Sequence, residues 1–181
     1  MNRCNGFPHR NGFPHRLHEV ITRGRVFTLF QQIADTHAPT LTARHTRGPV
    51  IQQWLAEMQQ AGLCSQQIEL DLNYRRTGNV VLSLGQNAAK PVWAMAHLDM
   101  ISFLSGSYAD GRYPLTPYCE ARQTSGRRAA LALDFASEPA GEIVANGWLC
   151  STEQGHFFET ENANLPPATR VVYASQAYWD R

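Results

Sequence analysis

The chain has 181 residues, of which 43% are hydrophobic and 17% are charged, and its formal net charge is +1. This composition is typical of a soluble globular protein with one domain or two small ones, and it lacks the basic excess that attracts nucleic acid or an anionic membrane. A membrane-spanning helix needs roughly 18 or more consecutive apolar residues. The apolar stretch from Val92 to Ala96 has five. We therefore expect neither a nucleic-acid partner nor an association with a membrane.

The cysteines predict a reducing compartment. They are widely separated and form neither a Cys-x-x-Cys pair nor the dense pattern of a secreted disulfide framework: Cys4, Cys64, Cys119 and Cys150. No apolar segment follows the N-terminal arginines, so a secretory signal is not expected. We interpret the thiols as free and the protein as cytoplasmic.

Residues 1–24 are expected to form a flexible leader. They contain an internal repeat, NGFPHR at 5–10 and again at 11–16, whose Asn-Gly and Phe-Pro steps favour turns. Two six-residue copies are too short for a solenoid. His9, His15 and His18 could bind a metal ion, but their spacing fits neither a helix nor a strand, and the leader is the favoured interpretation.

Two amphipathic helices are expected after the leader. The first runs from Arg25 on a 3.6-residue period and ends near Pro39, which disfavours helix at the residue before it. The second begins at Pro49 and stops near Gly62. Its apolar residues repeat at spacings of three and four: Val50, Ile51, Trp54, Leu55 and Met58. Trp54 and Met58 could form a ligand-binding stripe, but such spacing is far more typical of core.

The period then changes to two. Residues 67–74 alternate apolar with polar, which predicts a strand with one solvated face near a sheet edge. Arg-Arg-Thr-Gly-Asn at 75–79 predicts a turn, and VVLSLG at 80–85 a second strand. The near-continuous apolar run PVWAMA at 91–96 predicts a third strand that is buried on both faces. These elements indicate the start of an α/β sheet.

His97 and Asp99 follow the third predicted strand. Open α/β sheets bind ligands beyond the carboxyl ends of their strands. Imidazole is a good zinc ligand, and a carboxylate two residues away can orient the ring and raise its basicity. The alternative is that both side chains merely satisfy backbone groups at a strand end, because an isolated His-x-Asp pattern is common.

The surrounding residues resemble the N-terminal half of the dinuclear-metal aminopeptidases, within them the glutamyl-aminopeptidase and cellulase-like (tetrahedral aminopeptidase) family. That family has a pattern similar to Ala-His-Met-Asp-Glu-Ile-Gly-Phe, and residues 96–103 read Ala-His-Leu-Asp-Met-Ile-Ser-Phe. The resemblance implies that His97 is a metal ligand, that Asp99 orients it, and that Gly78-Asn79 opens the preceding strand. Met100 and Ser102 depart from the commoner Glu and Gly, which puts the local turn in doubt more than the metal chemistry.

The rest of the chain predicts a second unit. Residues 104–119 are rich in Gly, Ser, Tyr and Pro and are expected to form a connection. Short candidate strands at 118–123, 127–135, 141–150, 155–160 and 169–175 predict a small barrel or sandwich. The resemblance implies a β-barrel inserted into an α/β/α sandwich. We thus expect a partial catalytic domain at 25–108, a barrel-like insert at 109–175 and a stub of the catalytic domain at 176–181.

The resemblance also implies that most of the metal site comes from elsewhere. In the family, the later metal ligands and a Glu-Glu pair with the general base follow the barrel, and no Glu-Glu occurs in this sequence. Asp180 lies near the place of the bridging aspartate but lacks its flanking residues. The complete site holds two divalent ions, zinc with cobalt or manganese as alternatives, and cleaves N-terminal residues from peptides. From this sequence we expect weak or absent zinc binding and no peptidase activity of the isolated chain.

Three hypotheses follow. The chain is a truncated or split aminopeptidase-related hydrolase that needs a complementary C-terminal half. Alternatively, it is a non-catalytic, barrel-bearing interaction protein that assembles with itself or with a full-length relative. The third possibility is an α/β domain with an accidental His-x-Asp. The first two predict an oligomer or complex, because open strand edges and apolar faces favour association.

Overall fold

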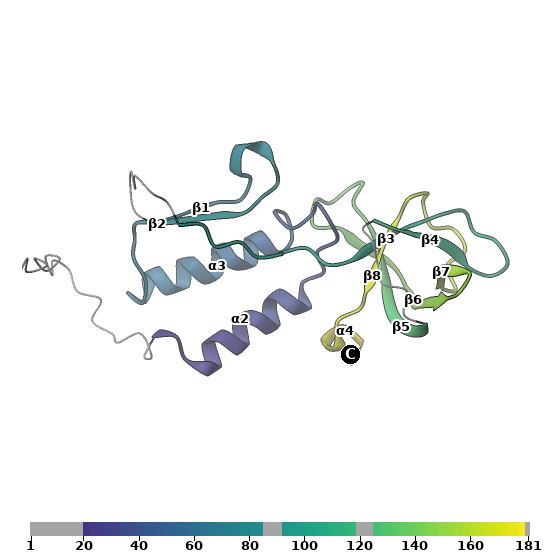
Figure 1. The fold of residues 1–181 in the computed structure, drawn as a ribbon, viewed down its shortest axis with the longest axis horizontal. Helices are drawn as coiled ribbons and strands as arrows, with labels where there is room; N and C mark the ends of the chain where they lie inside the picture. Colours follow the sequence, from purple (N-terminus) through teal and green to yellow (C-terminus); the bar gives the residue numbers. More distant parts are fainter. Residues whose placement is uncertain (1–19, 85–91, 119–124, 180–181) are drawn as a thin grey trace, which may run out of the picture.

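The computed structural model describes residues 20–84, 92–118 and 125–179. These residues form two parts side by side along the long axis: helices α2 and α3 with the β1–β2 hairpin at one end, and a β-barrel at the other (Figure 1). Several features discussed above lie outside the described residues. They are the NGFPHR repeat with His9, His15 and His18, the cysteines Cys4 and Cys119, and residues 119–123 of one candidate strand.

The two predicted helices are confirmed as α2 (Arg23–Asp35) and α3 (Arg47–Gln60). Thr22 caps α2, because its hydroxyl accepts a hydrogen bond of 3.2 Å from the backbone N–H of Arg25. Gly62 ends α3 as predicted: its φ of +67° is the left-handed conformation that closes a helix, and the next N–H, of Leu63, bonds the Met58 carbonyl at 2.9 Å.

The two helices differ in how well their apolar residues are covered. In α3, Leu55 and Met58 are buried and Trp54 is half-buried, which confirms the core role of Met58. In α2 no residue is buried, and Phe27 and Phe30 remain mostly exposed. The predicted helical period of α2 is therefore right, but its apolar face lies largely open to solvent.

The first two predicted strands are present as an antiparallel pair, β1 (Ile68–Asp71) and β2 (Val81–Leu84). In β1, Ile68 and Leu70 are half-buried while Glu69 and Asp71 are exposed, which confirms the one solvated face. The short 3-10 helix η1 (Tyr74–Arg76) overlaps the predicted turn at 75–79 and begins at Tyr74, which the alternation had placed in the strand.

The third predicted strand is wrong. The described part of that run, from Val92 on, forms no strand, and its side chains are exposed rather than buried on two faces: Val92 is 97% exposed, Trp93 63% and Met95 91%. The physical reason is the lack of neighbours. Among the described residues, none pairs with this segment in a sheet, so no layer covers either face. An apolar run favours burial only where other elements are available to bury it.

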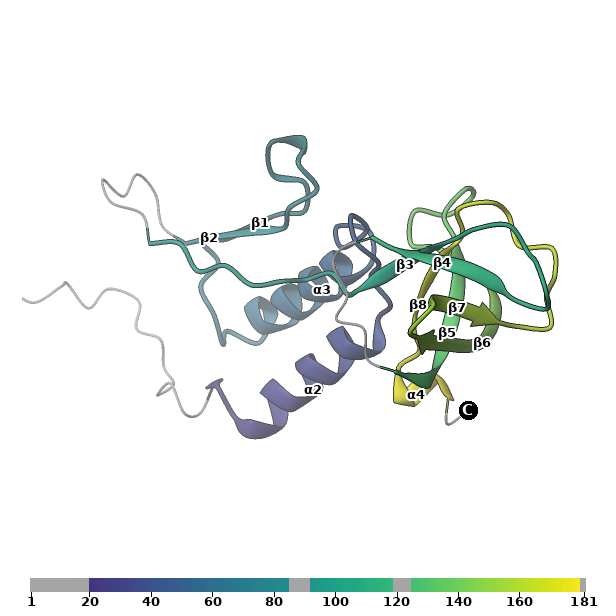
Figure 2. The same cartoon turned by 45° about the vertical axis from the view of Figure 1, so that its right-hand side comes forward.

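Of the two predicted alternatives, a small barrel or a sandwich, the structure has the barrel. Its six antiparallel strands are β3 (Ser102–Ser105), β4 (Tyr113–Pro117), β5 (Gly126–Asp134), β6 (Glu142–Thr152), β7 (Gly155–Glu159) and β8 (Arg170–Tyr173). They close in the order β3-β4-β7-β6-β5-β8, and Figure 2 shows β3 entering the barrel from the extended segment before it. Closure removes free sheet edges.

Two barrel strands were not predicted from the sequence. β3 begins at Ser102, inside the range expected for the first unit, and β4 lies in the Pro-rich segment. Pro114 and Pro117 mask β4 in the sequence, because proline is uncommon inside a sheet. In the structure Pro114 is exposed, while Tyr113 and Leu115 on either side of it point into the core.

The barrel interior is the main core of the described residues. Phe103, Tyr113, Leu149 and Phe158 are among its largest buried side chains. The Tyr113 hydroxyl donates to the Asn162 carbonyl at 3.0 Å and accepts from the Leu165 N–H at 2.9 Å, so its polar atom is satisfied inside the apolar core.

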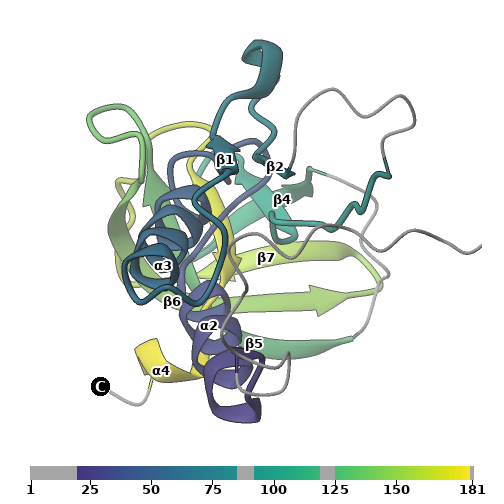
Figure 3. The same ribbon diagram turned by 90° about the vertical axis from the view of Figure 1, so that its left-hand side faces the viewer.

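A second, smaller cluster joins the barrel to residues that flank it in the sequence. Leu131, Leu133 and Val172 lie on the outside of the barrel and pack against Met100 and against Tyr178 of α4 (Gln176–Trp179). The Met100 N–H donates to the Ala38 carbonyl at 2.8 Å, which ties the start of β3 to the loop after α2. Viewed from the helical end, α2 and α3 lie in front of the barrel (Figure 3).

The described residues thus form a mixed α/β structure with a closed six-stranded antiparallel barrel and few helices. The finer expectation, an aminopeptidase-type α/β/α sandwich, would require a larger sheet than the two-stranded one that accompanies the helices. Among the described helices, none combines the length and the apolar character needed to cross a bilayer.

Candidate functional site

His97 and Asp99 lie together as the sequence predicted. The Nδ1 atom of His97 is 2.6 Å from Oδ1 of Asp99. The His97 side chain is 91% exposed, whereas that of Asp99 is 23% exposed. The Asp99 side chain is therefore largely covered, whereas the His97 ring projects into solvent.

This contact determines which ring nitrogen is available. An ionised carboxylate can only accept hydrogen bonds, so the Nδ1 atom of His97 must carry the proton that is donated to Asp99. In the neutral ring the Nε2 lone pair is then free and faces away from Asp99. A carboxylate bonded to the other ring nitrogen is the usual arrangement behind a metal-binding histidine. The pair has the geometry of a ligand and its orienting carboxylate.

The pair lines a hollow of about 420 Å³. One wall is the segment 95–99; the other walls are Leu41 with Ala43, and the turn 77–80 before β2. Gly78 and Asn79, which the resemblance singled out, belong to that turn. The hollow therefore lies between the loop after α2, the β1–β2 hairpin and the His97 segment.

Arg47 stands behind the pair, and the sequence reasoning missed it. It is the first residue of α3, and although it is an arginine it is 9% exposed. Its Nη1 donates to the Leu98 carbonyl at 2.6 Å, and its Nε donates to the Thr36 carbonyl at 3.0 Å. Burial lowers the pKa of Arg47, and the nearby Asp99 carboxylate raises it. The sequence signal was weak: a basic residue in the first helical turn, where the helix dipole disfavours positive charge.

Met100 and Ser102, which depart from the family pattern, both contact the loop after α2. The Sδ atom of Met100 accepts from the Ala38 N–H at 3.4 Å, and Oγ of Ser102 accepts from the Thr40 N–H at 3.4 Å. These two side chains therefore anchor the residues that follow Asp99, which is a structural role.

A second arrangement with catalytic residue types lies inside the barrel. Ser151 Oγ is 2.8 Å from Nδ1 of His156, and both residues are buried. The His156 ring packs against Phe103, with 5.1 Å between ring centroids. A serine nucleophile needs access to its substrate, and this pair belongs to the packed interior. His156 is therefore a core residue of β7.

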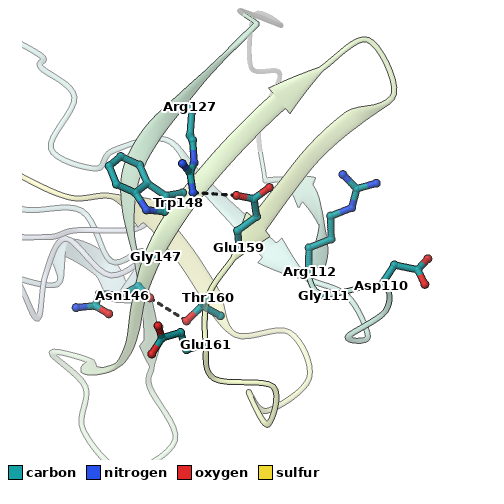
Figure 4. Close-up of a pocket in the computed structure, with 10 residues that line it drawn as sticks. All are labelled: Asp110, Gly111, Arg112, Arg127, Asn146, Gly147, Trp148, Glu159, Thr160 and Glu161. Atoms are coloured by element: carbon teal, nitrogen blue, oxygen red, sulfur yellow. Dashed lines mark hydrogen bonds and ion pairs between the residues drawn. The ribbon is translucent and has the colours of Figure 1, made fainter.

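A larger hollow of about 690 Å³ lies on the outer face of the barrel (Figure 4). Two of its charged side chains form an ion pair: Nη2 of Arg127 is 3.2 Å from Oε2 of Glu159, and the Arg127 guanidinium lies over the ring of Trp148 at 4.6 Å. Thr160 donates its hydroxyl to the Asn146 carbonyl at 2.8 Å. Next to this group, burial and Glu159 raise the pKa of the Cys150 thiol, which opposes formation of a reactive thiolate.

Side chains of the metal-binding types are not clustered in the described residues. Among them, no group of three or more His, Cys, Asp or Glu side chains is arranged to hold a metal ion. Asp180, the weaker candidate ligand, lies outside the described residues. Because catalytic zinc sites use three protein ligands, we derive no reaction step through a metal from these residues alone.

Comparison with protein-family models, with curated proteins and with solved structures found no match to this chain.

Proposed function

We propose that the chain carries the first metal-binding arm of an aminopeptidase-type metallohydrolase, by which we mean the ligand His97 together with its orienting carboxylate Asp99. The observation that supports this proposal is the 2.6 Å contact between His97 Nδ1 and Asp99 Oδ1, with the ring exposed and its Nε2 directed into open space. Such an arm orients one imidazole ligand before any metal arrives, which reduces the entropic cost of binding.

The proposal requires further ligands that the described residues do not supply. They would come from a complementary polypeptide, or from residues of this protein outside the described ranges. In a complete site, zinc would polarise the peptide carbonyl and lower the pKa of a bound water. This chain's contribution is narrower: His97 offers Nε2, Asp99 fixes the ring, and the hollow beside them leaves room for the missing ligands and a peptide end.

Metal titration followed by NMR tests the arm directly. We expect millimolar Co(II) to broaden the resonances around His97 and expect His97→Ala to remove that broadening. His45→Ala is the matched control, because His45 is also exposed but its Nε2 is 2.6 Å from the Arg44 Nε and has no carboxylate partner. Equal broadening around His45 and His97 would contradict the proposal.

Activity assays test the same proposal at the level of function. The isolated chain should not hydrolyse aminoacyl-nitroanilides in the presence of zinc or cobalt, because a single imidazole does not confer the affinity of a three-ligand site. Turnover that His97→Ala abolishes would show that the chain already holds a complete site. Turnover that appears only after a second polypeptide is added would support the shared-site form of the proposal.

Self-association is the second candidate function, and one observation favours it. The segment 92–98 is extended and highly exposed, with Val92 and Met95 more than nine-tenths open to water, and Leu82 and Leu84 of β2 are also exposed. A second copy of the chain could cover these side chains by pairing through the same segment, since extended edges template such pairing.

The oligomeric state decides this second proposal. Light scattering after size exclusion should show a dimer or larger species, and Met95→Lys should shift it toward the monomer. Ile143→Lys is the control, because Ile143 is an exposed apolar residue of the barrel at 40% exposure. A monomeric wild-type chain, or an equal effect of both substitutions, would exclude pairing through the segment 92–98.

A further inference from the structure

The Arg47 side chain, which begins α3, is hydrogen-bonded to main-chain carbonyl groups, one of which lies within the candidate site. Its guanidinium reaches two carbonyl groups that are far apart in sequence, those of Thr36 and Leu98, and neither is a side-chain partner. Arginine can span two acceptors in fixed directions because its donors form a rigid planar fork. An arginine that is 9% exposed and bonded in this way holds its acceptors in one geometry.

The position of the second acceptor is what matters for the site. Leu98 separates His97 from Asp99, and its carbonyl belongs to the planar peptide unit that ends at the Asp99 Cα. A hydrogen bond of 2.6 Å from a charged donor fixes the direction of that plane. The direction of the plane sets where the Asp99 side chain leaves the backbone, and therefore whether its carboxylate reaches the His97 ring.

The backbone is hydrogen-bonded after Asp99 but not before it. After Asp99, the Met100 N–H bonds the Ala38 carbonyl at 2.8 Å. Before it, residues 92–98 make no backbone–backbone hydrogen bond to another described residue. The hydrogen bond from Arg47 to the Leu98 carbonyl therefore restrains the chain just before Asp99, where residues 92–98 without backbone hydrogen bonds meet the hydrogen-bonded Met100.

We propose that Arg47 is a positioning residue for the His97–Asp99 pair: by holding the Leu98 carbonyl, it keeps the Asp99 carboxylate in place to accept the Nδ1 proton of His97. This inference rests on the proposed function for its purpose, but its geometry concerns the metal-free chain. The competing explanation is that Arg47 only ties α3 to the loops around it, in which case its loss would lower stability and leave the ring unaffected.

The imidazole tautomer separates the two explanations. Long-range ¹H–¹⁵N NMR of the full chain at about pH 8, where an ordinary histidine is neutral, should show His97 mainly as the Nδ1–H tautomer. In Arg47→Gln we expect the ratio of Nδ1–H to Nε2–H forms to fall by roughly threefold to tenfold, the range that losing one constraining hydrogen bond produces. Arg47→Lys keeps the charge but cannot span both carbonyls, so its ratio should be close to that of Arg47→Gln.

Thr46→Val is the matched control. Thr46 is the buried neighbour of Arg47, and its hydroxyl donates to the Thr42 carbonyl at 3.1 Å, so the substitution removes a buried hydrogen bond that does not involve Leu98. It should lower the unfolding temperature without changing the His97 tautomer ratio. A folded Arg47→Gln variant with the wild-type ratio would overturn the proposal, as would an equal change in Thr46→Val.

A measurement on the wild-type chain keeps the proposal testable if the Arg47 variants fail to fold. The Arg47 Nε–H should exchange slowly with water and show slow guanidinium rotation, and a rapidly exchanging, freely rotating group would overturn the proposal. These readouts need neither metal nor substrate. A failed metal titration with an intact tautomer effect would therefore count against the proposed function and leave the role of Arg47 standing.

Discussion

The barrel and the segment 92–98 are both rich in apolar residues, but these residues are buried in the barrel and exposed in the segment. Phe103, Leu149 and Phe158 are almost completely buried within the closed barrel. Val92, Trp93 and Met95, a few residues before β3, are mostly exposed. The difference lies in available neighbours: each barrel strand has a partner on both sides, and the segment 92–98 has none among the described residues. The barrel is therefore expected to supply most of the folding stability, and the segment 92–98 offers apolar side chains for contacts with another chain.

The largest effect should come from emptying the barrel core. Phe103→Ala removes a fully buried ring and should lower the free energy of unfolding by about 3–5 kcal/mol. Chemical denaturation measures this loss. Ile101→Ala is the control, because Ile101 precedes β3 and is 43% exposed. A loss at Phe103 no greater than at Ile101 would mean that the barrel is not the main source of stability.

The hydroxyl of Tyr113 should contribute less. Tyr113→Phe leaves the ring in place but leaves the Asn162 carbonyl and the Leu165 N–H without their shared partner. We expect a loss of about 1–3 kcal/mol, the cost of leaving buried polar groups unsatisfied. Thermal unfolding of Tyr113→Phe and Tyr118→Phe compares a buried tyrosine with an exposed one, and the second change should be near neutral. Similar shifts for both would contradict the assignment.

The junction between the two parts should respond to pH through His37. Its Nε2 accepts from the Ser175 N–H at 3.2 Å, which requires that nitrogen to be unprotonated. Burial, and secondarily Arg47, lower the pKa of His37 below its ordinary 6.5, while Asp35 acts in the opposite direction. The unfolded chain thus binds the proton more readily, so this contribution to stability is complete above 6.5 and is lost as the pH falls from there through the lowered pKa.

The expected size of this pH effect is about 1 kcal/mol, the net worth of one hydrogen bond. Unfolding measured at about pH 8 and about pH 5 brackets the titration of histidine. His37→Asn retains an acceptor but does not titrate, so its stability should vary less with pH than that of the wild type. His45→Asn should keep the wild-type dependence. The same flattening in both variants would rule out His37 as the source.

The smallest effect on folding is expected in the exposed segment. Met95→Ala should change the free energy of unfolding of the monomer by less than about 0.5 kcal/mol, because the side chain is 91% exposed. Denaturation at low protein concentration gives the monomer value. A loss comparable to that of Phe103→Ala would show that the segment is covered in solution, and a loss that grows with protein concentration would favour self-association.

Local elements were predictable because short-range patterns specify them. The period of α3, its stop at Gly62 and the alternation in β1 follow from residues close in sequence. β3 and β4 were not predictable, because Tyr113 and Leu115 become core positions only when β7 and β3 lie beside them. The burial of 92–96 was wrongly predicted for the related reason that an apolar run carries no information about which element covers it.

For the candidate site, the sequence by itself determined that His97 and Asp99 can meet, because they are two residues apart and their side-chain chemistry is complementary. Only the tertiary structure decided which atom faces outward and what lies behind the pair. Arg47 precedes Leu98 by 51 positions, and its contact exists because α3 packs beside the loop that leads into β3. A hydrogen bond between such distant residues depends on the path of the chain in space, which no local pattern encodes.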